Sequence, residues 1–420
     1  MQIYLVGGAI RDRLLGLPIK ERDYLVVGAT ADELRQQGYQ QVGRDFPVFL
    51  HPLTHDEYAL ARTQRGVSSS PEATPVPHAD PKVTLEEDLA RRDLTINAIA
   101  EDESGQLIDL FGGVRDLQLR VLRHVSPAFS EDPIRVLRVA RFMARYHALG
   151  FTVADETMAL MGRMVEQGAL ERLVPERVWQ ELKAALATDD PVPFFHTLRS
   201  CGALSRVLPE IDRLWGVPQP ERWHPEVDCG VHTMMTLQIA CRLTPALPVR
   251  FAALTHDLGK GVTPLDILPS HHGHEAVGVR LVGSLCERLR IPTRYRLLAE
   301  RAAKYHGLCH RLNELQAKTV LKLLEDLDAF RRPQLFEEYL LVCEADYRGR
   351  KGFQNLSYPQ AIEFKRLYAA AREVDQSMLK GLQGEAYGQA RTQPHHAAHD
   401  LAGLALRRGV AQVVEAGADA

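Results

Sequence analysis

Residues 3–12 read Ile-Tyr-Leu-Val-Gly-Gly-Ala-Ile-Arg-Asp, and this stretch decides the fold of the first part of the chain. An apolar run that ends in two glycines predicts a strand followed by a turn, from which backbone N–H groups can approach a phosphate. Gly8 and Arg11 are therefore candidates for holding the triphosphate of a nucleotide. The alternative is an ordinary glycine turn, because short motifs recur by chance.

Two acidic residues, Glu21 and Asp23, stand directly before the apolar run 24–27. Residues two apart on a strand project from the same face, so we expect both carboxylates to point the same way. Mg²⁺ prefers hard oxygen ligands and usually keeps substrate phosphates in its coordination shell. The pair is therefore predicted to be catalytic and to bind Mg²⁺. A solvated charged loop is the alternative.

The first 130 residues mix short strands and helices, which predicts a small α/β domain. We expect strands at 3–6, 24–27, 47–50, 58–61 and 107–110, and helices near 12–17, 31–37 and 85–100. Thr84 and Glu87 form a capping-box pattern at the start of the third helix. Residues 66–81 hold four prolines and three serines. This composition predicts a mobile flap, with a simple linker as the alternative.

From Asp132 onward helical periodicity replaces the strand pattern, so the rest of the chain should be almost wholly helical. We expect four parts: a head at 1–130, a helical neck and body at 131–220, a module at 221–330 and a helical tail at 331–420. The last residues, from about 392, are expected to be a frayed or disordered end.

Composition matches an ordinary globular protein, with 45% hydrophobic and 25% charged residues among 420. No apolar window reaches the ~18 residues of a membrane span, so we expect a cytoplasmic protein without a membrane partner. Six scattered cysteines argue against a disulfide framework and structural zinc. The net charge of −3 does not by itself indicate a nucleic-acid partner. Locally, however, residues 115–145 hold seven arginines against three acidic residues.

A helix is predicted to begin with Asp132 as its N-cap and Pro133 as its first residue. Arg135, Arg138 and Arg141 recur at a spacing of three, so they should form one stripe on this helix. A carboxylate beside a guanidinium offers donors and acceptors in one plane, which suits reading the edge of a base. The alternative is a solvated, salt-bridged helix face.

Residues 91–98 read Arg-Arg-Asp-Leu-Thr-Ile-Asn-Ala. Guanidinium groups pair with phosphate oxygens bidentately, so Arg92 is a candidate for a triphosphate or ribose contact. A surface pair of cations is the competing interpretation.

These motifs, in this order, resemble class II tRNA nucleotidyltransferases, the bacterial CCA-adding enzymes. The resemblance implies a polymerase-β-like head, a helical neck that selects the base, and a body and tail that grip tRNA. It implies a set of site residues in this sequence: Gly8 and Arg11 for the triphosphate, Glu21 and Asp23 for Mg²⁺, and Arg92, Asp132, Arg135, Arg138 and Arg141 for the incoming nucleotide. Glu57 is a weaker candidate for a third carboxylate.

Two features depart from that family. It commonly has Asp at the position of Glu21, so we expect metal binding to be retained and nucleotide addition to be slower. Its flap is rich in glycine and holds an aromatic residue, whereas residues 66–81 lack any aromatic residue. In that family the loop aids the switch from C to A addition, so the resemblance implies that addition of the terminal A is the step affected.

A second group of candidates lies in the helical half of the chain. His256 and Asp257 end an apolar run, Gly259 can stop the helix, and His232 stands 24 residues upstream. Imidazole with carboxylate suits divalent transition metals. With 17 histidines in the chain, a chance cluster is the alternative.

The arrangement resembles the HD phosphohydrolase superfamily, whose pattern is His, His-Asp and a distal Asp. The resemblance implies His232, His256, Asp257 and Asp346 as ligands of Ni²⁺ or another divalent metal, with His256 and Asp257 catalytic. His274 and His306 are candidates for outer positions or for contacts with the substrate.

Together the two resemblances imply an enzyme like the multifunctional bacterial form of the CCA-adding enzymes. Such an enzyme adds CCA to the 3′ end of tRNA from CTP and ATP without a nucleic-acid template. It also has 2′,3′-cyclic phosphodiesterase, 2′-nucleotidase and phosphatase activities. We expect tRNA, ATP and CTP as partners and a monomer or homodimer. The alternatives are a poly(A) polymerase, and an HD phosphohydrolase whose head binds tRNA without synthesis.

Overall fold

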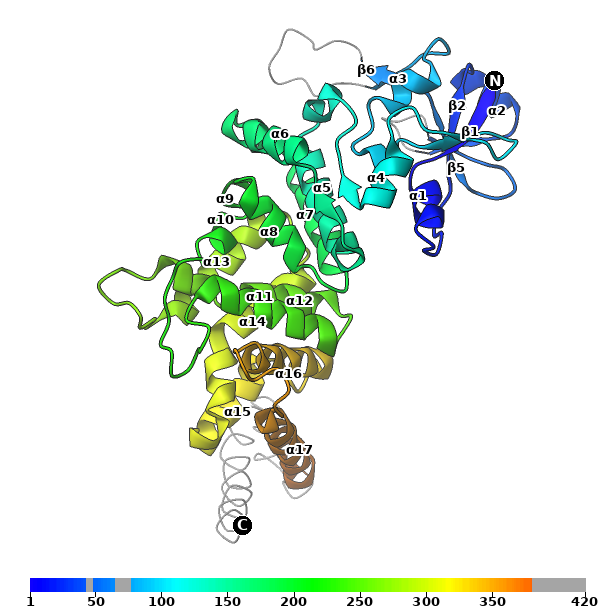
Figure 1. Ribbon diagram of the computed structural model, residues 1–420. Coiled ribbons are helices and arrows are strands. Elements are labelled where there is room, and N and C mark those ends of the chain that lie inside the picture. The colour runs from blue at the N-terminus through cyan, green and yellow to red at the C-terminus, as the bar shows by residue number, and fades with distance from the viewer. Residues whose placement is uncertain (43–47, 65–76, 380–420) are drawn as a thin grey trace. The chain divides into compact units, whose positions relative to one another are not determined.

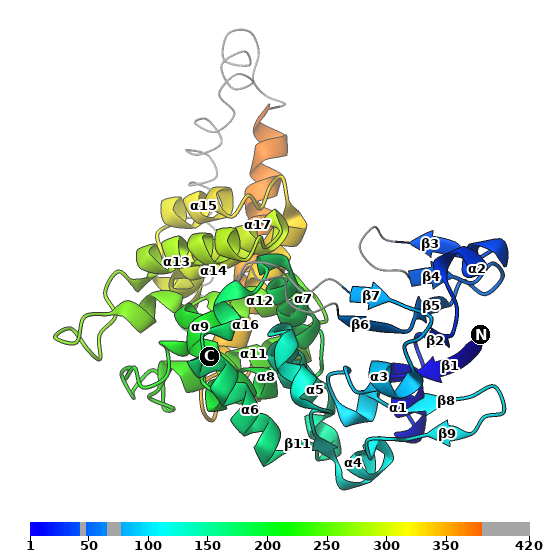
Figure 2. The same cartoon turned by 90° about the horizontal axis from the view of Figure 1, so that it is seen from above.

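The computed structural model describes residues 1–42, 48–64 and 77–379. Residues 66–76 of the predicted flap lie outside the described residues, and so does the whole of the predicted frayed end. The chain folds as two compact units: one takes Met1–Glu181 and Pro193–Val207, and the other takes Leu182–Val192 and the chain from Leu208 onward. Each unit is described by itself (Figures 1 and 2). The four-part division expected from sequence stays a prediction.

A seven-stranded mixed sheet forms the first part of unit 1, in the order β3-β4-β5-β2-β1-β8-β9, as Figure 2 shows. Its strands are β1 (Gln2–Val6), β2 (Asp23–Val27), β3 (Gln40–Val42), β4 (Val48–Leu50), β5 (Glu57–Leu60), β8 (Ala100–Glu101) and β9 (Leu107–Ile108). The pairs are antiparallel except β2 with β5, which are parallel. This parallel pair aligns the first residues of the two strands.

The sheet buries both faces, as the period of two in strand β2 shows. Leu25 packs in a cluster with Val6 and Leu89 on one face, whereas Val26 packs with Leu34 of α2 (Ala31–Gln36) on the other. Burial on both faces explains why residues 24–27 are apolar without alternation.

Helices complete unit 1. They are α1 (Gly8–Leu14), α3 (Leu85–Leu89), α4 (Gly113–Leu119), α5 (Ile134–Tyr146), α6 (Asp155–Glu166), α7 (Pro175–Leu186), α8 (Val192–Ser200) and α9 (Leu204–Val207), with 3-10 turns η1 (Thr95–Asn97), η2 (Pro127–Glu131), η3 (His147–Leu149) and η4 (Ala169–Arg172). The end of α7, from Leu182, and the first residue of α8 belong to unit 2. Two short pairs, β6 (Arg62–Gln64) with β7 (Pro77–Ala79) and β10 (Val121–Leu122) with β11 (Thr152–Val153), lie outside the main sheet.

The helix predicted near 85–100 is wrong beyond its first turns. Its start is confirmed, because Glu87 N–H donates to the Thr84 hydroxyl and the Glu87 carboxylate accepts from the Thr84 N–H. α3 nevertheless ends at Leu89, and the Asp93 carboxylate accepts from the N–H of Leu94 and from the Asn97 side chain. These local hydrogen bonds compete with the helix and fold 91–97 into a turn.

Several smaller boundaries also differ from the prediction. α1 begins at Gly8 rather than near residue 12, and β5 begins at Glu57 rather than at Tyr58. The strand predicted at 107–110 ends at Ile108. Helix α2 and strand β1 agree with the prediction to within one residue.

Unit 2 is helical. Its elements are α10 (Pro209–Asp212), α11 (Cys229–Leu243), α12 (Leu247–Thr255), η5 (Leu258–Val262), α13 (His274–Arg288), α14 (Thr293–His310), η6 (Leu312–Glu314), α15 (Ala317–Asp326), α16 (Pro333–Arg348) and α17 (Pro359–Leu379). Helix α12 is the centre, since residues 248–255 are all buried and α11, α14 and α16 pack against it. Across the described ranges, no helix is long and apolar enough to cross a membrane.

Gly259 does not stop the preceding helix as predicted, because α12 already ends at Thr255. It lies inside η5, where a Cβ would stand 2.0 Å from the His274 carbonyl oxygen and 2.8 Å from the Gly278 nitrogen. The missing side chain thus lets η5 contact the first turn of α13. This contact brings Lys260 and His274 to the same region.

Gly113 offers a test of packing in unit 1. A Cβ there would stand 2.3 Å from the Thr95 carbonyl oxygen and 2.7 Å from Ile99 Cγ1. We expect Gly113→Ala to lower the free energy of unfolding by about 1–3 kcal/mol through overpacking. Gly162→Ala, inside α6 with open space around it, should raise stability by up to about 1 kcal/mol. Urea unfolding followed by circular dichroism measures both, and equal effects of the two variants would contradict the packing argument.

Candidate active sites

The head brings two carboxylates together at the start of two strands. Asp23 opens β2 and Glu57 opens β5, and the parallel register pairs these two residues. Glu21 lies in the exposed loop before β2, so its predicted place on the strand is wrong. The strand begins only where β1 provides a partner, Val6, for Asp23. The strand register therefore aligns Asp23 with Glu57, whereas the position of Glu21 depends on the loop before β2.

Charges around Asp23 show which predicted residues lie near it. Desolvation raises the pKa of the Asp23 carboxyl, Arg92 lowers it, Glu21 raises it further, and Arg11 lowers it. The Asp23 carboxyl is thus electrostatically coupled to three other predicted site residues, which are Glu21, Arg11 and Arg92. A group of this kind suits a bound cation facing an anion.

The glycine pair is flanked by two guanidinium groups. Gly7 has a φ of 72°, and a Cβ there would stand 3.0 Å from Arg92 Nη1. A Cβ on Gly8 would stand 3.4 Å from Arg11 Nη2. Arg11 donates to the Asn97 side chain (2.5 Å), and Arg92 donates to the Asn97 carbonyl oxygen (3.3 Å). Asn97 thus holds both cations beside the turn that follows β1.

The predicted arginine stripe on α5 is paired throughout. Arg138 Nε donates to Asp93 (2.8 Å), Arg141 Nε donates to Glu181 (2.5 Å), and Arg135 donates to the carbonyl oxygens of Ala128 and Arg91. The first two contacts are those of a salt-bridged helix face, the alternative interpretation of this stripe. The contact of Arg135 with Arg91 also ties α5 to the segment that carries Arg92.

Asp132 is near the predicted helix start but is not its N-cap. α5 begins at Ile134 with Pro133 as N-cap, and the Asp132 carboxylate accepts from the Ile134 N–H (3.3 Å). Both Asp132 oxygens accept from Arg177, at 3.2 and 2.7 Å. Sequence reasoning missed Arg177, because it follows Asp132 by 45 positions and no motif marks it.

Asp93 anchors α5 from inside unit 1. Its carboxylate is buried and accepts from Arg138, Asn97 and the Leu94 N–H. Although burial alone would raise it, these partners lower the pKa of Asp93 to about 2. The ionised form is therefore the one that the fold stabilises.

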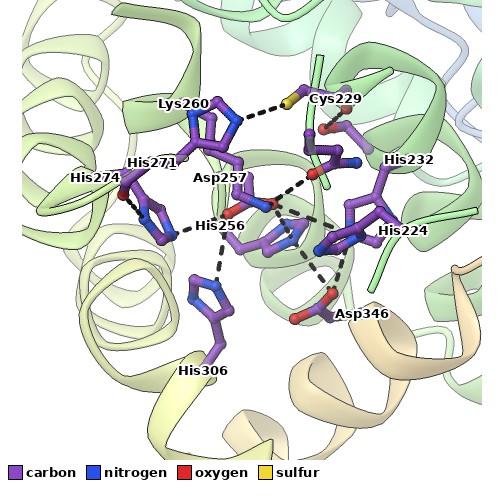
Figure 3. Close-up of polar contacts among 12 residues, drawn as sticks. His224, Cys229, His232, His256, Asp257, Lys260, His271, His274, His306 and Asp346 are labelled. Carbon is purple, nitrogen blue, oxygen red and sulfur yellow. Dashed lines mark hydrogen bonds and ion pairs between the residues drawn. The ribbon is translucent and has the colours of Figure 1, made fainter. Parts of the chain in front are cut away.

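The four candidates in unit 2 come together from helices α11 and α16 and from the two residues that follow α12 (Figure 3). His232 lies on α11, His256 and Asp257 follow α12, and Asp346 lies on α16. His232 Nε2 is 3.0 Å from Asp346 Oδ1, and His256 Nε2 is 3.2 Å from Asp257 Oδ2 and 3.6 Å from Asp346 Oδ1. All four are at most 2% exposed, so the site lies inside the helical unit.

Backbone carbonyls fix the orientation of the surrounding imidazoles. The Nδ1 atoms of His256, His274 and His306 lie 2.8, 2.6 and 2.8 Å from the carbonyl oxygens of Ala253, His271 and Ala302. A carbonyl can only accept, so each Nδ1 donates and each Nε2 is left to face the carboxylates. His232 Nδ1 lies 2.9 Å from the buried Glu226 carboxylate. These contacts turn every Nε2 towards Asp257 or Asp346.

Several buried atoms of this group have no hydrogen-bond partner among the residues described. They are His256 Nε2, Asp257 Oδ1 and His274 Nε2. A buried polar atom left unpaired costs about 1–3 kcal/mol, so such a concentration calls for a ligand. Two sets of donors, His232 with His256 and Asp346 and His256 with Asp257 and His306, each have their atoms within 4.8 Å of one another. Nitrogen and carboxylate donors of this kind fit a divalent transition metal.

Charge compensation keeps both aspartates ionised. Lys260 Nζ lies 2.7 Å from Asp257 Oδ2 and donates to the Gln219 side chain (3.0 Å). Despite burial, His256 and Lys260 hold the pKa of Asp257 well below its usual range. Burial lowers the pKa of His306 to about 3, so its ring is neutral at physiological pH.

Two residues that contact the candidate ligands were not predicted. Glu226 supports His232, and His310 Nε2 lies 2.6 Å from Asp346 Oδ2. The second had a signal in the sequence, because His310 stands four residues after His306 on α14 and therefore on the same helix face. Glu226 had none, since the loop that carries it has no periodic pattern.

Family models match most of the chain. They are "Poly A polymerase head domain" at residues 3–123, "Probable RNA and SrmB- binding site of polymerase A" at 150–214, and "HD domain" at 230–347. The fold and the two sites thus define a nucleotidyltransferase head joined to an HD domain, as the sequence predicted.

Similarity to one relative identifies the particular family. The chain is 61% identical over 392 residues to a multifunctional CCA protein of Thioalkalivibrio sulfidiphilus (strain HL-EbGR7), covering 93% of this chain and 96% of that protein. The chain belongs to the family of multifunctional CCA proteins.

Solved structures share the fold. A CCA-adding enzyme in apo form II matches with a TM-score of 0.61 at 20% identity, covering 98% of this chain and 92% of that one. A tRNA-processing enzyme in apo form I matches with a TM-score of 0.58 at 22% identity, covering 96% and 93%. At this identity the likeness concerns the fold.

Asp93 leads to a prediction about stability and pH. Its pKa of about 2 lies below the unfolded value of about 3.9, so its contribution is present above pH 4 and is lost as pH falls towards 2. We expect Asp93→Asn to lower the free energy of unfolding by on the order of 2–3 kcal/mol at pH 7. The difference from wild type should shrink by pH 3.

Urea unfolding at both pH values measures this difference. Asp32→Asn is the matched control, because Asp32 pairs with Arg35 on the exposed face of α2 and should contribute less than about 1 kcal/mol. A difference for Asp93→Asn that is equally large at pH 3 and pH 7 would reject the role of the ionised carboxylate.

Proposed function

We propose that this enzyme adds CCA to the 3′ end of tRNA, using CTP and ATP and no nucleic-acid template. The proposal extends to the HD domain, which would hydrolyse phosphate esters at RNA ends as a 2′,3′-cyclic phosphodiesterase, 2′-nucleotidase and phosphatase. The name of the curated relative supports the first activity, and the match to the HD domain supports the second. Because its substrate is tRNA, we propose that it acts in the cytoplasm.

One observation carries the synthetic activity: the register that places Asp23 beside Glu57, next to the cations around the glycine turn. In this proposal Asp23 and Glu21 hold Mg²⁺, and Glu57 serves as a third carboxylate. Bound Mg²⁺ would lower the pKa of the attacking 3′-hydroxyl and neutralise charge on the pyrophosphate that leaves. The chain's own part is to fix the carboxylates at adjacent strand positions.

The triphosphate is assigned to Gly8, Arg11 and Arg92. Both guanidinium groups are held by Asn97, so they need little reorganisation when an anion arrives. Gly7, whose φ is positive, adds a turn that a larger side chain would strain. Phosphate would therefore bind where backbone and cations are already arranged.

Base selection is assigned to the start of α5. Asp132 and Arg135 would read the incoming base by hydrogen bonds, and Arg138 and Arg141 would contact the nucleotide from the same helix. Because Asp132 accepts from Arg177, a base that donates to Asp132 competes with Arg177 for the carboxylate oxygens. This competition favours bases that present hydrogen-bond donors to the Asp132 carboxylate.

The hydrolytic activity is assigned to His232, His256, Asp257 and Asp346 as ligands of a divalent metal, with Ni²⁺ as the candidate. A bound divalent ion would supply a water of lowered pKa as nucleophile. The protein orients the imidazoles through carbonyls and through Glu226. Lys260 balances the negative charge of Asp257.

The nucleotide partners have parallel support. Structures titled as a tRNA-processing enzyme with CTP and as a CCA-adding enzyme with ATP match this chain with TM-scores of 0.57 and 0.60. We propose CTP and ATP as substrates here, and a monomer or homodimer as the working state.

Specific observations support each of the two alternative functions. The matching head model carries the name of poly(A) polymerase, and Glu21 lies off the strand, which would suit a head that binds tRNA without synthesis. The products made from each nucleotide distinguish all three functions.

We expect a tRNA that lacks its terminus to gain about two residues with CTP alone and about three with CTP and ATP together. A sequencing gel of the products gives the count. Long tracts from ATP alone would favour poly(A) polymerase. Retained tRNA binding without incorporation would favour the head that does not synthesise.

Separate variants should divide the two activities. We expect Asp23→Asn to slow nucleotide addition by about 10²-fold or more and leave hydrolysis of a 2′,3′-cyclic nucleotide unchanged. Asp257→Asn should do the reverse. Asp32→Asn, on the exposed face of α2, serves as the control and should change neither rate. Loss of both activities in either variant would reject two independent sites.

A further inference from the structure

Asp12 ends the motif at residues 3–12, and the proposed mechanism does not use it. The residue is only 6% exposed, and its carboxylate accepts hydrogen bonds from two helices. Arg11 Nε of α1 donates to Oδ1 (2.9 Å), Arg145 Nη2 of α5 donates to Oδ2 (2.9 Å), and the Tyr146 hydroxyl of α5 donates to Oδ1 (3.0 Å). Burial raises the pKa of Tyr146 to about 12, so its hydroxyl keeps this proton at neutral pH. One buried carboxylate thus joins α1 to the end of α5.

The same contacts fix the guanidinium group of Arg11, which is assigned to the triphosphate. Its Nε and Nη2 atoms each lie 2.9 Å from Asp12 Oδ1, and its Nη1 donates to the Asn97 side chain (2.5 Å). The guanidinium carbon also lies 5.2 Å from the ring centre of Phe142 and 5.4 Å from that of Tyr146, both on α5. Cation–π attraction at this range adds to the ion pair. The position of Arg11 therefore depends on where α5 lies.

A second attachment of α5 closes these contacts into a ring. Asn97 Nδ2 donates to Asp93 Oδ1 (2.8 Å), and Arg138 of α5 donates to Asp93 Oδ2 (2.8 Å). Arg11 therefore reaches α5 by two routes, one through Asn97 and one through Asp12. The helix is held near its middle by Asp93 and at its end by Asp12. Two fixed points set the direction of a helix, whereas one point leaves it free to pivot.

The direction of α5 matters at its other end, where Asp132 and Arg135 are assigned to base selection. Arg135 lies in the first turn of α5 and Tyr146 in the last, so at about 1.5 Å per residue they are roughly 16 Å apart along the axis. A tilt about the middle of α5 would move the base-reading groups relative to Arg11. Misplacement by about 1 Å is enough to slow an enzyme.

We propose that Asp12 is a positioning residue for nucleotide addition, which makes recognition of the triphosphate by Arg11 depend on the position of α5 and hence on recognition of the base. This inference rests on the proposed nucleotidyl transfer. A nucleotide with the correct base stabilises α5 in the position in which Arg11 is held for the triphosphate, whereas a nucleotide with the wrong base gains less from this contact. The Asp12 carboxylate needs no contact with the substrate for this role.

The test compares CTP with UTP in single additions to a tRNA that lacks its terminus. CTP presents an amino donor where UTP presents a carbonyl oxygen, so the pair reports on base reading. We expect Asp12→Asn to raise KM for CTP about 10-fold and keep kcat within about twofold, because Arg11 binds the triphosphate equally in the ground and transition states. The ratio of kcat/KM for CTP over UTP should fall about 10-fold, because the wrong base has little of this contact to lose.

Tyr146→Phe provides a second test in a chain that keeps the carboxylate. It removes one hydrogen bond to Asp12, so we expect KM for CTP to rise about threefold. The double variant with Asp12→Asn should be no worse than Asp12→Asn alone, because both changes act on one joint. Arg13→Gln is the matched control, since this neighbour on α1 pairs with Glu101 of β8. It should change neither KM nor the ratio of CTP over UTP.

A merely structural role of Asp12 predicts a different pattern, and circular dichroism measures the folded fraction of each variant. If Asp12→Asn lowers kcat in proportion to the folded fraction while KM and the ratio of CTP over UTP keep their wild-type values, the proposal is rejected. Additive effects of Asp12→Asn and Tyr146→Phe would reject it as well. Absence of CTP incorporation by the wild-type chain would reject the proposed function, and this inference with it.

Discussion

The burial of one carboxylate, Asp257, is the constraint on which the helical unit depends. A buried carboxylate costs free energy unless cations and donors surround it, so the elements around it must supply them. Lys260 comes from η5, His256 from the end of α12, His274 from α13 and His306 from α14. The packing of these elements around α12 is therefore also the assembly of the site, and a shift of any one of them would change the surroundings of the charge.

The head solves the same problem in a different way. Asp93 is also buried, but arginine, asparagine and a backbone N–H satisfy both of its oxygens. Complete pairing makes it a rigid link between α5 and the turn 91–97. Around Asp257, by contrast, Oδ1 is left unpaired in the described structure. The difference between a saturated and an unsaturated carboxylate separates a structural joint from a centre that can accept an ion.

Local signals in the sequence were sufficient for features that neighbouring residues determine. The capping box at Thr84 is one, and the joining of an α/β head to helices is another. Contacts that depend on distant partners were not predictable. Asp93 binds Arg138, 45 positions away, and Asp132 binds Arg177 at the same separation. Resemblance to known families, rather than spacing alone, indicated the distal Asp346, which no local pattern ties to His232.

The order of the elements along the chain also determines when each site can form during synthesis. Asp346 follows His232 by 114 positions, and α16, which carries it, is among the last helices that the structure describes. Domains generally fold from the N-terminal end during synthesis, so the strands and carboxylates of the head exist well before α16 leaves the ribosome. The group of metal-ligating candidates in the HD domain therefore stays incomplete until α16 has been synthesised.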